Sequence, residues 1–567
     1  MNRISARWGH SISLLIVLGF ISWLYGSFVA NPIVFDDANL FVNLSVFDYA
    51  EQLFSAQPRT FPYFSLGLVH VLSGGNLVWN RWLSLVLHGA VLLALNAFLH
   101  RAVPAWDNDD IGRRRYALGV VCLWMAINPM AVYGVAYLVQ RTIVMATLFS
   151  LLSFTLYLRA QQTLRWADLF SSAFLAWLAM MCKEHAILTP IAAIMLTPLC
   201  GDWTRERLAR TATNLVISLP AMLWVLWHRG SAIVGTSYEV YAGQVLSQVA
   251  GLDFPGGPWA MSAATQALLF WKYGLLWLVP FPGWMSADLR VDFAAIWANP
   301  LAYAGLVASV TAVALALLAW CRPVRYAAWA VWASVLLFAA VPFAIELSTV
   351  RVQEPFVLYR SYLWMPAYAL LLAMVLVRID GSLARQSAGM RRKFFWVILL
   401  GGCCLLFPAA QDRLRSFSSE QALWQDALDK LPHPAVAGAD RIYYNLAGEA
   451  FKRREYAEAL RLSDLVIAQN PAAFQGYLAR GTSLLALARG DEAMQAFDVA
   501  EAHQPPKEFL GYIEFKRCGV IEARGDRAGV IACLRRSARL GYEMARFRLK
   551  LAGLDVTDAG DAARRSE

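Results

Sequence analysis

The sequence predicts an all-α protein in two parts, a polytopic membrane region followed by a region of helical repeats. Three observations support this prediction. Hydrophobic residues make up 58% of the 567-residue chain, and its mean hydropathy is +0.46. Apolar stretches long enough to cross a bilayer recur from residue 9 to about residue 410. Beyond that point the chain becomes charged and rich in alanine, and two segments are similar at a spacing of 34 residues.

The apolar stretches predict about eleven transmembrane helices. They lie at 9–30, 79–100, 116–130, 139–158, 166–182, 186–200, 211–228, 301–320, 327–345, 358–377 and 393–410. The first follows Arg3 and Arg7, and no small-x-small cleavage site comes after it, which favours an uncleaved signal anchor. The further stretch 267–280 ends in Pro280-Phe281-Pro282-Gly283, which favours a re-entrant or interfacial helix over a crossing.

The distribution of basic residues predicts the orientation in the membrane. Arg and Lys gather in the connection after every second span, while the opposite connections are long, aromatic and poor in both. The formal charge of +10 therefore encodes topology and does not indicate a nucleic-acid partner. We expect a bacterial inner-membrane protein with a cytoplasmic N-terminus, a membrane domain over 1–410 and a periplasmic C-terminus. The loops 31–78 and 229–300 are then periplasmic.

The region 411–554 is predicted to be a periplasmic domain of tetratricopeptide-like repeats. Tyr443, Ala459 and Pro471 of one segment correspond to Tyr477, Ala493 and Pro505 of the next. Small residues let paired helices approach closely, aromatic residues fill the gaps, and proline ends the second helix. Such repeats either stabilise the C-terminus or present a concave face to a protein, and we favour the second function. The tail 555–567 is predicted to be disordered, and whether Cys518 and Cys533 are bridged is left open.

Charged and aromatic residues gather at the predicted periplasmic ends of the spans, where charge is costly and usually functional. The acidic pair Asp36-Asp37 follows the first span. The other candidates are Arg59, Arg141, Lys183, Glu184, His185, Glu354, Tyr359, Arg360 and Tyr362. Cations bind phosphate, apolar walls hold a lipid tail, and a carboxylate removes a proton from a hydroxyl group, so this mixture suits a lipid-linked sugar phosphate.

Each candidate also has a structural interpretation. Asp36-Asp37 alone is more typical of the N-cap of a helix, here from Ala38 to Phe54. Arg141 or Arg360 would extend along the helix to the interface, and Lys183 and Glu184 would neutralise each other. His88, inside the second span, is expected to pack or to bond another helix and not to bind a ligand.

With these residues in hand, the chain resembles the transmembrane, tetratricopeptide-bearing protein O-mannosyltransferases of the GT-C glycosyltransferase superfamily. The matching motifs, in family order, are Phe35-Asp36-Asp37; Asn128-Pro129-Met130-Ala131-Val132 with Arg141 and Phe149-Ser150-Leu151-Leu152; Lys183-Glu184; and Glu354 with Leu358-Tyr359 and Pro366. The sequence departs from the family at Pro58-Arg59, Ile143 and Pro355. It is also similar to bacterial type IV pilin glycosyltransferases, which use polyprenyl-phosphate arabinofuranose.

The resemblance implies a GT-C membrane fold and inverting transfer of a mannose- or arabinofuranose-type sugar from a polyprenyl-phosphate donor to a periplasmic acceptor such as pilin. It implies a catalytic role for Asp36, with Asp37 in support or binding a divalent cation such as Mg²⁺ or Mn²⁺. Arg59, Arg141, Lys183 and Arg360 would bind the donor phosphate. Glu184, His185, Glu354, Tyr359 and Tyr362 would line the pocket for sugar or acceptor. No cofactor other than this metal is implied.

Three alternatives remain at the level of sequence. The acceptor could be a glycan or a lipid instead of a protein. A transporter of lipid-linked sugars also needs charges in the membrane, although it usually shows internal symmetry. A membrane-anchored scaffold would need the repeats but would tolerate changes at Asp36, Arg141 or Lys183.

Overall fold

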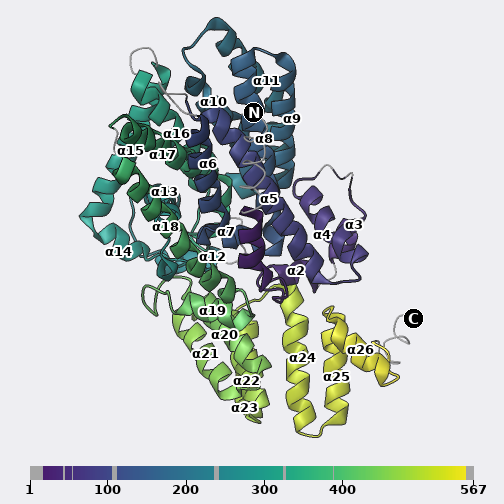
Figure 1. The fold of residues 1–567 in the computed structure, drawn as a ribbon. Coiled ribbons are helices and arrows are strands. Elements are labelled where there is room, and N and C mark those ends of the chain that lie inside the picture. The colour runs from purple at the N-terminus through teal and green to yellow at the C-terminus, as the bar shows by residue number, and fades with distance from the viewer. Residues whose placement is uncertain are drawn as a thin grey trace. The chain divides into compact units, whose positions relative to one another are not determined.

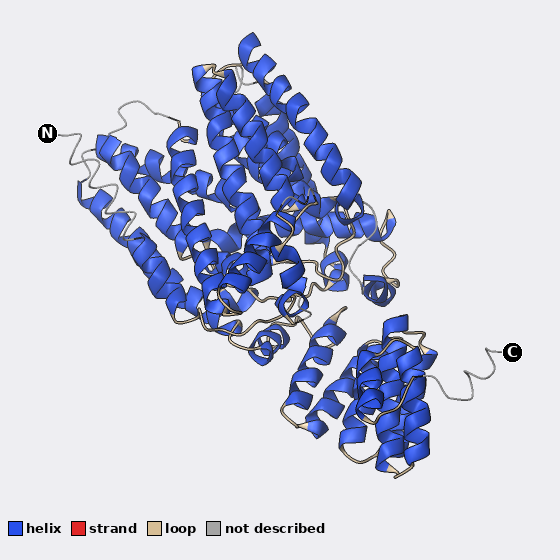
Figure 2. Cartoon of the chain, turned by 90° about the vertical axis from the view of Figure 1, so that its right-hand side faces the viewer, coloured by secondary structure: helices blue, strands red, loops and turns tan. Residues whose placement is uncertain are grey.

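The computed structural model describes residues 17–42, 45–53, 55, 57–104, 111–234, 242–322, 327–386 and 389–556. Within these ranges the chain is helical, with no strand beyond an isolated antiparallel bridge between Leu289 and Phe356 (Figure 2). The predicted all-α class is confirmed. The chain divides into two compact units. The membrane unit comprises Met1–Val240, Leu252–Leu289 and Phe293–Asp426, and the repeat unit comprises Tyr241–Gly251, Arg290–Asp292 and Ala427–Glu567.

Seven helices within the described residues are long and apolar enough to cross a bilayer. They are Leu77–Ala102 (α5), Leu138–Thr163 (η1, Leu138–Gln140, with α8, Arg141–Thr163), Arg205–Gly230 (in α11, Arg205–Ile233), Pro300–Cys321 (α15), Ala328–Leu347 (in α16, Ala327–Leu347), Met365–Arg385 (α17) and Gly389–Ser416 (α18). Each overlaps a predicted span, and Figure 1 labels the helices in chain order. The chain is therefore a multi-pass membrane protein.

The predicted span at 116–130 is part of a bent pair. Helix α6 (Ile111–Ala126) is followed by α7 (Pro129–Val135), and the two are bent by 60° at the break. Asn128 satisfies the backbone there. Its side-chain oxygen accepts the N–H of Met130 at 3.0 Å, and its amide nitrogen donates to the carbonyl of Trp277 at 2.9 Å. Counted as one crossing, the pair gives up to eight spans in the described residues.

The predicted number of about eleven spans is not confirmed. Helix α9 (Trp166–Cys182) has 17 residues, and the segment predicted at 186–200 is divided into η2 (Glu184–Leu188), α10 (Thr189–Met195) and η3 (Thr197–Cys200). Pro190 and Pro198 stand at the starts of α10 and η3, where the ring is tolerated but the previous helix ends. Of the first predicted span, the described part contains the apolar helix Val17–Gly26.

Three short helices fill the first predicted loop. They are α2 (Asp37–Phe41), α3 (Ser45–Ala50) and α4 (Thr60–Leu72). The continuous helix expected from Ala38 to Phe54 is wrong, because α2 and α3 are separate. Burial explains the difference, since Phe41, Val46 and Leu66 share one apolar cluster that folds these helices onto each other.

The second predicted loop contains α12 (Ala242–Val249), α13 (Gly257–Leu278), η4 (Pro282–Trp284) and α14 (Phe293–Ala298). Helix α13 covers the apolar stretch that ends at Pro280. It is one continuous helix of 22 residues that packs against α15 and α16 and is not among the seven candidate spans. Its predicted re-entrant or interfacial position stays a prediction.

The repeat unit is a series of antiparallel helix pairs. Its helices are α20 (Ala439–Lys452), α21 (Tyr456–Gln469), α22 (Phe474–Ala486), α23 (Gly490–Ala502), α24 (Lys507–Ala523), α25 (Arg527–Arg539) and α26 (Glu543–Leu551). The domain boundary falls between Asp426 and Ala427, inside α19 (Glu420–Leu428), and not near residue 410, because α18 continues to Ser416. Most of the predicted disordered tail, 557–567, lies outside the described residues.

The residues that repeat in the sequence occupy equivalent places in these pairs. Tyr443 and Tyr477 fall in the first helix of a pair, and Ala459 and Ala493 fall in the second. At Gly481 an added Cβ would lie 2.6 Å from the Phe497 ring, so only glycine allows this approach of α22 and α23. The packing therefore follows the predicted pattern of small and aromatic residues, while the assignment to the tetratricopeptide class stays a prediction.

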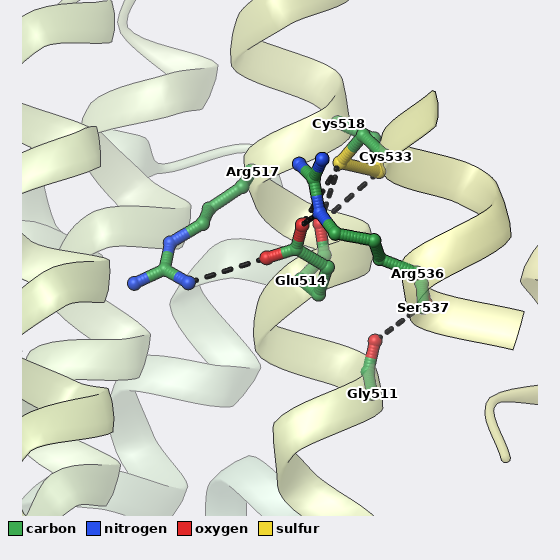
Figure 3. Close-up of a disulfide and its surroundings, with 7 residues drawn as sticks. All are labelled: Gly511, Glu514, Arg517, Cys518, Cys533, Arg536 and Ser537. Carbon is green, nitrogen blue, oxygen red and sulfur yellow. Dashed lines mark hydrogen bonds and ion pairs between the residues drawn. A yellow bond between two sulfur atoms is a disulfide. The ribbon is translucent and has the colours of Figure 1, made fainter. Parts of the chain in front are cut away.

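A disulfide links Cys518 of α24 to Cys533 of α25, with 5.5 Å between the Cα atoms (Figure 3). Both cysteines are fully buried. Glu514, one turn before Cys518, pairs with Arg517 at 3.2 Å and with Arg536 of α25 at 2.7 Å. The bridge left open by the sequence is thus present, and it closes the third helix pair.

Candidate active site

The acidic pair begins α2, and its two carboxylates have different surroundings. Asp36 is at the N-cap position of α2 but makes no side-chain capping bond, so the N-cap interpretation does not describe it. Asp37 is fully buried, and its two oxygens accept the backbone N–H groups of Leu138 at 3.3 Å and Val139 at 2.8 Å. Asp37 therefore fastens this loop to the start of the α8 span, whereas Asp36 is only half-buried.

Burial also perturbs the acidity of Asp37. It raises the pKa of this carboxyl to about 7, although the N–H of Val139 and the charge of Arg81 act in the opposite direction. A carboxylate that holds two backbone groups is poorly placed to accept a proton from a substrate. The geometry thus separates an anchoring acid, Asp37, from a candidate catalytic acid, Asp36.

Arg59 and Glu184 form a two-point ion pair that links the first loop to the segment after α9. The Arg59 Nε donates to Glu184 Oε2 at 2.7 Å, and a terminal nitrogen donates to the other oxygen. The backbone N–H of Arg59 also donates to the carbonyl of Met181 at 2.8 Å. Burial alone would raise the pKa of the Glu184 carboxyl, but the Arg59 guanidinium lowers it well below its usual value.

Lys183 does not pair with Glu184, contrary to the structural interpretation of the sequence. Within the described residues no carboxylate lies within 4.0 Å of its ammonium, which is instead 5.8 Å from the centre of the Tyr359 ring. The residue is only 4% exposed. Burial and the nearby charge of Arg59 lower the pKa of the Lys183 ammonium to about 7, while Glu184 acts in the opposite direction.

A second buried network surrounds Glu346, near the end of α16. Its carboxylate lies 3.0 Å from Arg360, 3.3 Å from Arg351 and 3.5 Å from His185. His185 also lies 3.2 Å from Glu184, which joins the two networks. Several charges buried together in this way fix one another in place.

Arg360 connects this network to the aromatic residues of the site. It lies in η5 (Leu358–Leu363), pairs with Glu354 at 3.2 Å and lies 5.9 Å from the Tyr359 ring. The Tyr359 ring in turn meets the Tyr137 ring edge to face, at 6.1 Å between centroids. Tyr359 therefore lies near the two cations Lys183 and Arg360 and also near the Tyr137 ring.

The structure thus brings together most of the candidate residues through a continuous chain of contacts. The members are Asp36, Arg59, Lys183, Glu184, His185, Glu354, Tyr359 and Arg360. They come from segments that end or begin at apolar helices, namely the first loop, the α9–η2 junction and η5. Charged groups and an aromatic ring therefore meet at the ends of apolar helices.

Two candidates lie elsewhere. Arg141 is 1% exposed and donates to neutral groups of α4 and α5, including the Asn80 carbonyl at 2.6 Å and the Ser65 hydroxyl at 3.2 Å. Its donors are therefore used inside the helix bundle and do not point to a phosphate. The Tyr362 hydroxyl is 2.6 Å from Nδ1 of buried His88, so this hydroxyl is engaged inside the helix bundle. The expectation that His88 bonds another helix is confirmed.

Sequence reasoning missed two residues of the site. Glu346 holds Arg360 and His185, and the Tyr137 hydroxyl accepts the backbone N–H of Asp36 at 3.0 Å. A carboxylate inside an otherwise apolar helix is a signal that could have identified Glu346. Nothing in the local sequence distinguishes Tyr137 from other aromatic residues near the membrane interface.

The acidic pair does not fit a dedicated cation site. Both oxygens of Asp37 accept backbone N–H groups. In the parts of the chain that the structure describes, no three His, Cys, Asp or Glu side chains are grouped as metal ligands. We therefore assign no chemical step to a metal ion.

Comparison with known proteins adds no family. No protein-family model matches the chain, and no curated protein or solved structure is significantly similar to it.

Proposed function

We propose that this protein is an inverting glycosyltransferase that moves a sugar from a polyprenyl-phosphate donor to a periplasmic acceptor. The observation that carries the proposal is the position of buried Lys183 near half-buried Asp36, close enough for the charge of Asp36 to influence it, while no carboxylate among the described residues lies within 4.0 Å of its ammonium. A base and a cation for the leaving group are the two functions that such a transfer requires.

The cations of the site differ in whether a carboxylate already pairs with them. Arg59 is engaged by Glu184, and Arg360 by Glu346 and Glu354. Lys183 is close enough to Asp36, Arg59 and Arg360 for their charges to influence it, but in the described parts of the chain no carboxylate pairs with its ammonium, which lies 5.8 Å from the centre of the Tyr359 ring. Lys183 is thus the cation that remains available to a donor phosphate, with Arg59 and Arg360 adding positive potential nearby.

The proposed step is a single displacement. The Asp36 carboxylate accepts the proton of the acceptor hydroxyl group as its oxygen attacks the anomeric carbon of the donor. The bond from that carbon to the phosphate oxygen breaks, and both bonding electrons leave with the polyprenyl phosphate. Lys183 stabilises the charge that develops on this phosphate, and the attack from the opposite face inverts the anomeric carbon.

The position of the site suits a lipid-linked donor. Lys183 follows α9, Arg360 precedes α17, and Asp36 follows the apolar helix Val17–Gly26. A sugar phosphate at these helix ends would leave its polyprenyl chain among apolar side chains and lipid. The charge pattern supports a periplasmic position for the site, and the Cys518–Cys533 disulfide supports an oxidising compartment for the repeat unit.

The repeat unit supports a protein acceptor, such as pilin. Paired helices that stack in series generally present an extended face to a polypeptide. The motif resemblance leaves the sugar between a mannose- and an arabinofuranose-type residue, and intact-mass analysis of secreted and pilus proteins, with and without the gene, distinguishes the two.

The substitution Asp36→Asn tests the proposed chemistry. Because the amide cannot accept the proton, we expect kcat to fall by about 10²–10⁴-fold while the protein remains folded and inserted. The assay measures transfer of radiolabelled sugar from a polyprenyl-phosphate donor by the detergent-purified full chain. The matched control is Asp48→Asn, an exposed acid in α3, which should keep full activity. Near-normal transfer by Asp36→Asn would refute the assignment, and movement of the donor across a vesicle membrane without transfer would favour a transporter.

A further inference from the structure

We propose that Glu420 is a positioning residue that fixes the direction of the Asp36 carboxylate by holding the backbone of the preceding residue. The inference rests on one part of the proposed function, namely that Asp36 accepts the proton of the acceptor hydroxyl group. It starts from Phe35, whose φ of +58° lies in the left-handed region. An aromatic residue rarely adopts this conformation, and it persists only where the surroundings hold it.

Such backbone conformations are concentrated at the site. Three non-glycine residues of the described membrane unit have positive φ, namely Phe35, Arg59 and Leu164. Leu164 is the C-cap of α8, a usual place for a left-handed residue. Phe35 and Arg59 instead adjoin Asp36 and Glu184, and neither ends a helix. Strain of this kind gathers where a side chain must point in one direction.

Two side chains hold the strained segment. The N–H of Phe35 donates to Glu420 Oε1 at 2.5 Å, and the N–H of Asp36 donates to the Tyr137 hydroxyl at 3.0 Å. Two successive backbone groups are therefore bonded to side chains from distant parts of the sequence. With φ of Phe35 and the Asp36 peptide fixed, the direction of the Asp36 Cα–Cβ bond is fixed, and the carboxylate is limited to the few positions that the side-chain rotamers allow.

Glu420 is itself held in place. Its second oxygen accepts the indole N–H of Trp424 at 2.8 Å, and the Trp424 ring lies 5.4 Å from the Phe35 ring between centroids. Glu420 and Trp424 lie one turn apart on α19, and Trp424 is 3% exposed. Helix α19 thus contacts Phe35 twice, through a hydrogen bond to its N–H and through packing against its ring. Glu420 acts through Phe35 and Asp36 and needs no contact with the substrate.

The experiment compares Glu420→Ala with Glu420→Gln in the full chain. We expect Glu420→Ala to lower kcat by about 100-fold, as a small misplacement of a catalytic group does, while the KM for the donor stays within about twofold. Glu420→Gln should recover part of the loss, because its amide oxygen still accepts the Phe35 N–H. Tyr137→Phe, which removes the acceptor for the Asp36 N–H, should lower kcat in the same way. Gln421→Ala, an exposed neighbour on α19, is the matched control and should leave kcat unchanged.

Hydrogen exchange provides a readout that does not depend on transfer. In Glu420→Ala the peptide that contains Phe35 and Asp36 should exchange faster, while peptides of α8 keep their protection. If the wild-type chain transfers no sugar, the proposed function fails and the exchange rates still test the positioning role. Unchanged exchange at Phe35, or unchanged kcat despite faster exchange, would overturn the inference. A loss of α8 protection would also overturn it, since Glu420 would then serve general stability.

Discussion

The membrane unit and the repeat unit both contain many ion pairs, but they use them under opposite conditions. The side chains of Glu184 and Glu346 are 0% and 2% exposed. In the repeat unit, the paired side chains of Arg489 and Glu492 are 47% and 44% exposed. Water screens the exposed pair but not the buried ones. Breaking a buried ion pair should therefore cost much more stability than breaking the exposed pair.

The largest expected effect tests this contrast directly. Glu346→Ala would leave Arg351 and Arg360 buried without their shared carboxylate, and we expect a loss of unfolding free energy of about 3–5 kcal/mol. Thermal unfolding of the detergent-solubilised protein measures it. Glu492→Ala, which opens an exposed pair, should give no measurable change in the unfolding midpoint. Equal unfolding midpoints for Glu346→Ala and Glu492→Ala would contradict the expected difference between buried and exposed ion pairs.

The repeat unit should depend more on its covalent link than on its surface charges. Replacing Cys518 and Cys533 by alanine opens a loop of sequence separation 15, and the expected loss is about 3 kcal/mol. Limited proteolysis should then cut first at α24–α26, while the membrane unit keeps its stability. If the double variant unfolds at the same temperature as the wild type, the disulfide does not stabilise the repeat unit.

The smallest expected effect concerns pH. Since burial lowers the pKa of Lys183 to about 7, its ammonium predominates at pH 6 and its neutral amine at pH 8. A neutral amine attracts phosphate less, so kcat/KM for the donor should fall by about tenfold as the pH rises over this interval. Lys183→Arg should remove this pH dependence, because a guanidinium remains protonated. The same fall in that variant would assign the titration to another group.

The apolar runs of the sequence predict the seven long helices well, because each run is a local property of the chain. The charges of 183–185 and 354–360 were also expected at one site, and the structure joins them through Glu346. The contacts of Arg141 with Asn80 and of Tyr362 with His88 could not be predicted, since they form between different segments of the bundle. Sequence spacing gives the position of a residue along its helix but does not identify its partner on another helix.

The break between α6 and α7 has a consequence for the order of assembly. Asn128 there donates to the carbonyl of Trp277, a residue 149 positions later in the chain. Trp124 donates to the same carbonyl at 3.2 Å. During synthesis α6 and α7 leave the ribosome long before α13, so these polar groups acquire their final partner only after several more helices have been inserted. The bend that leads to Tyr137 is therefore completed late in biogenesis, and a chain truncated before α13 should retain its early helices but lack a finished site.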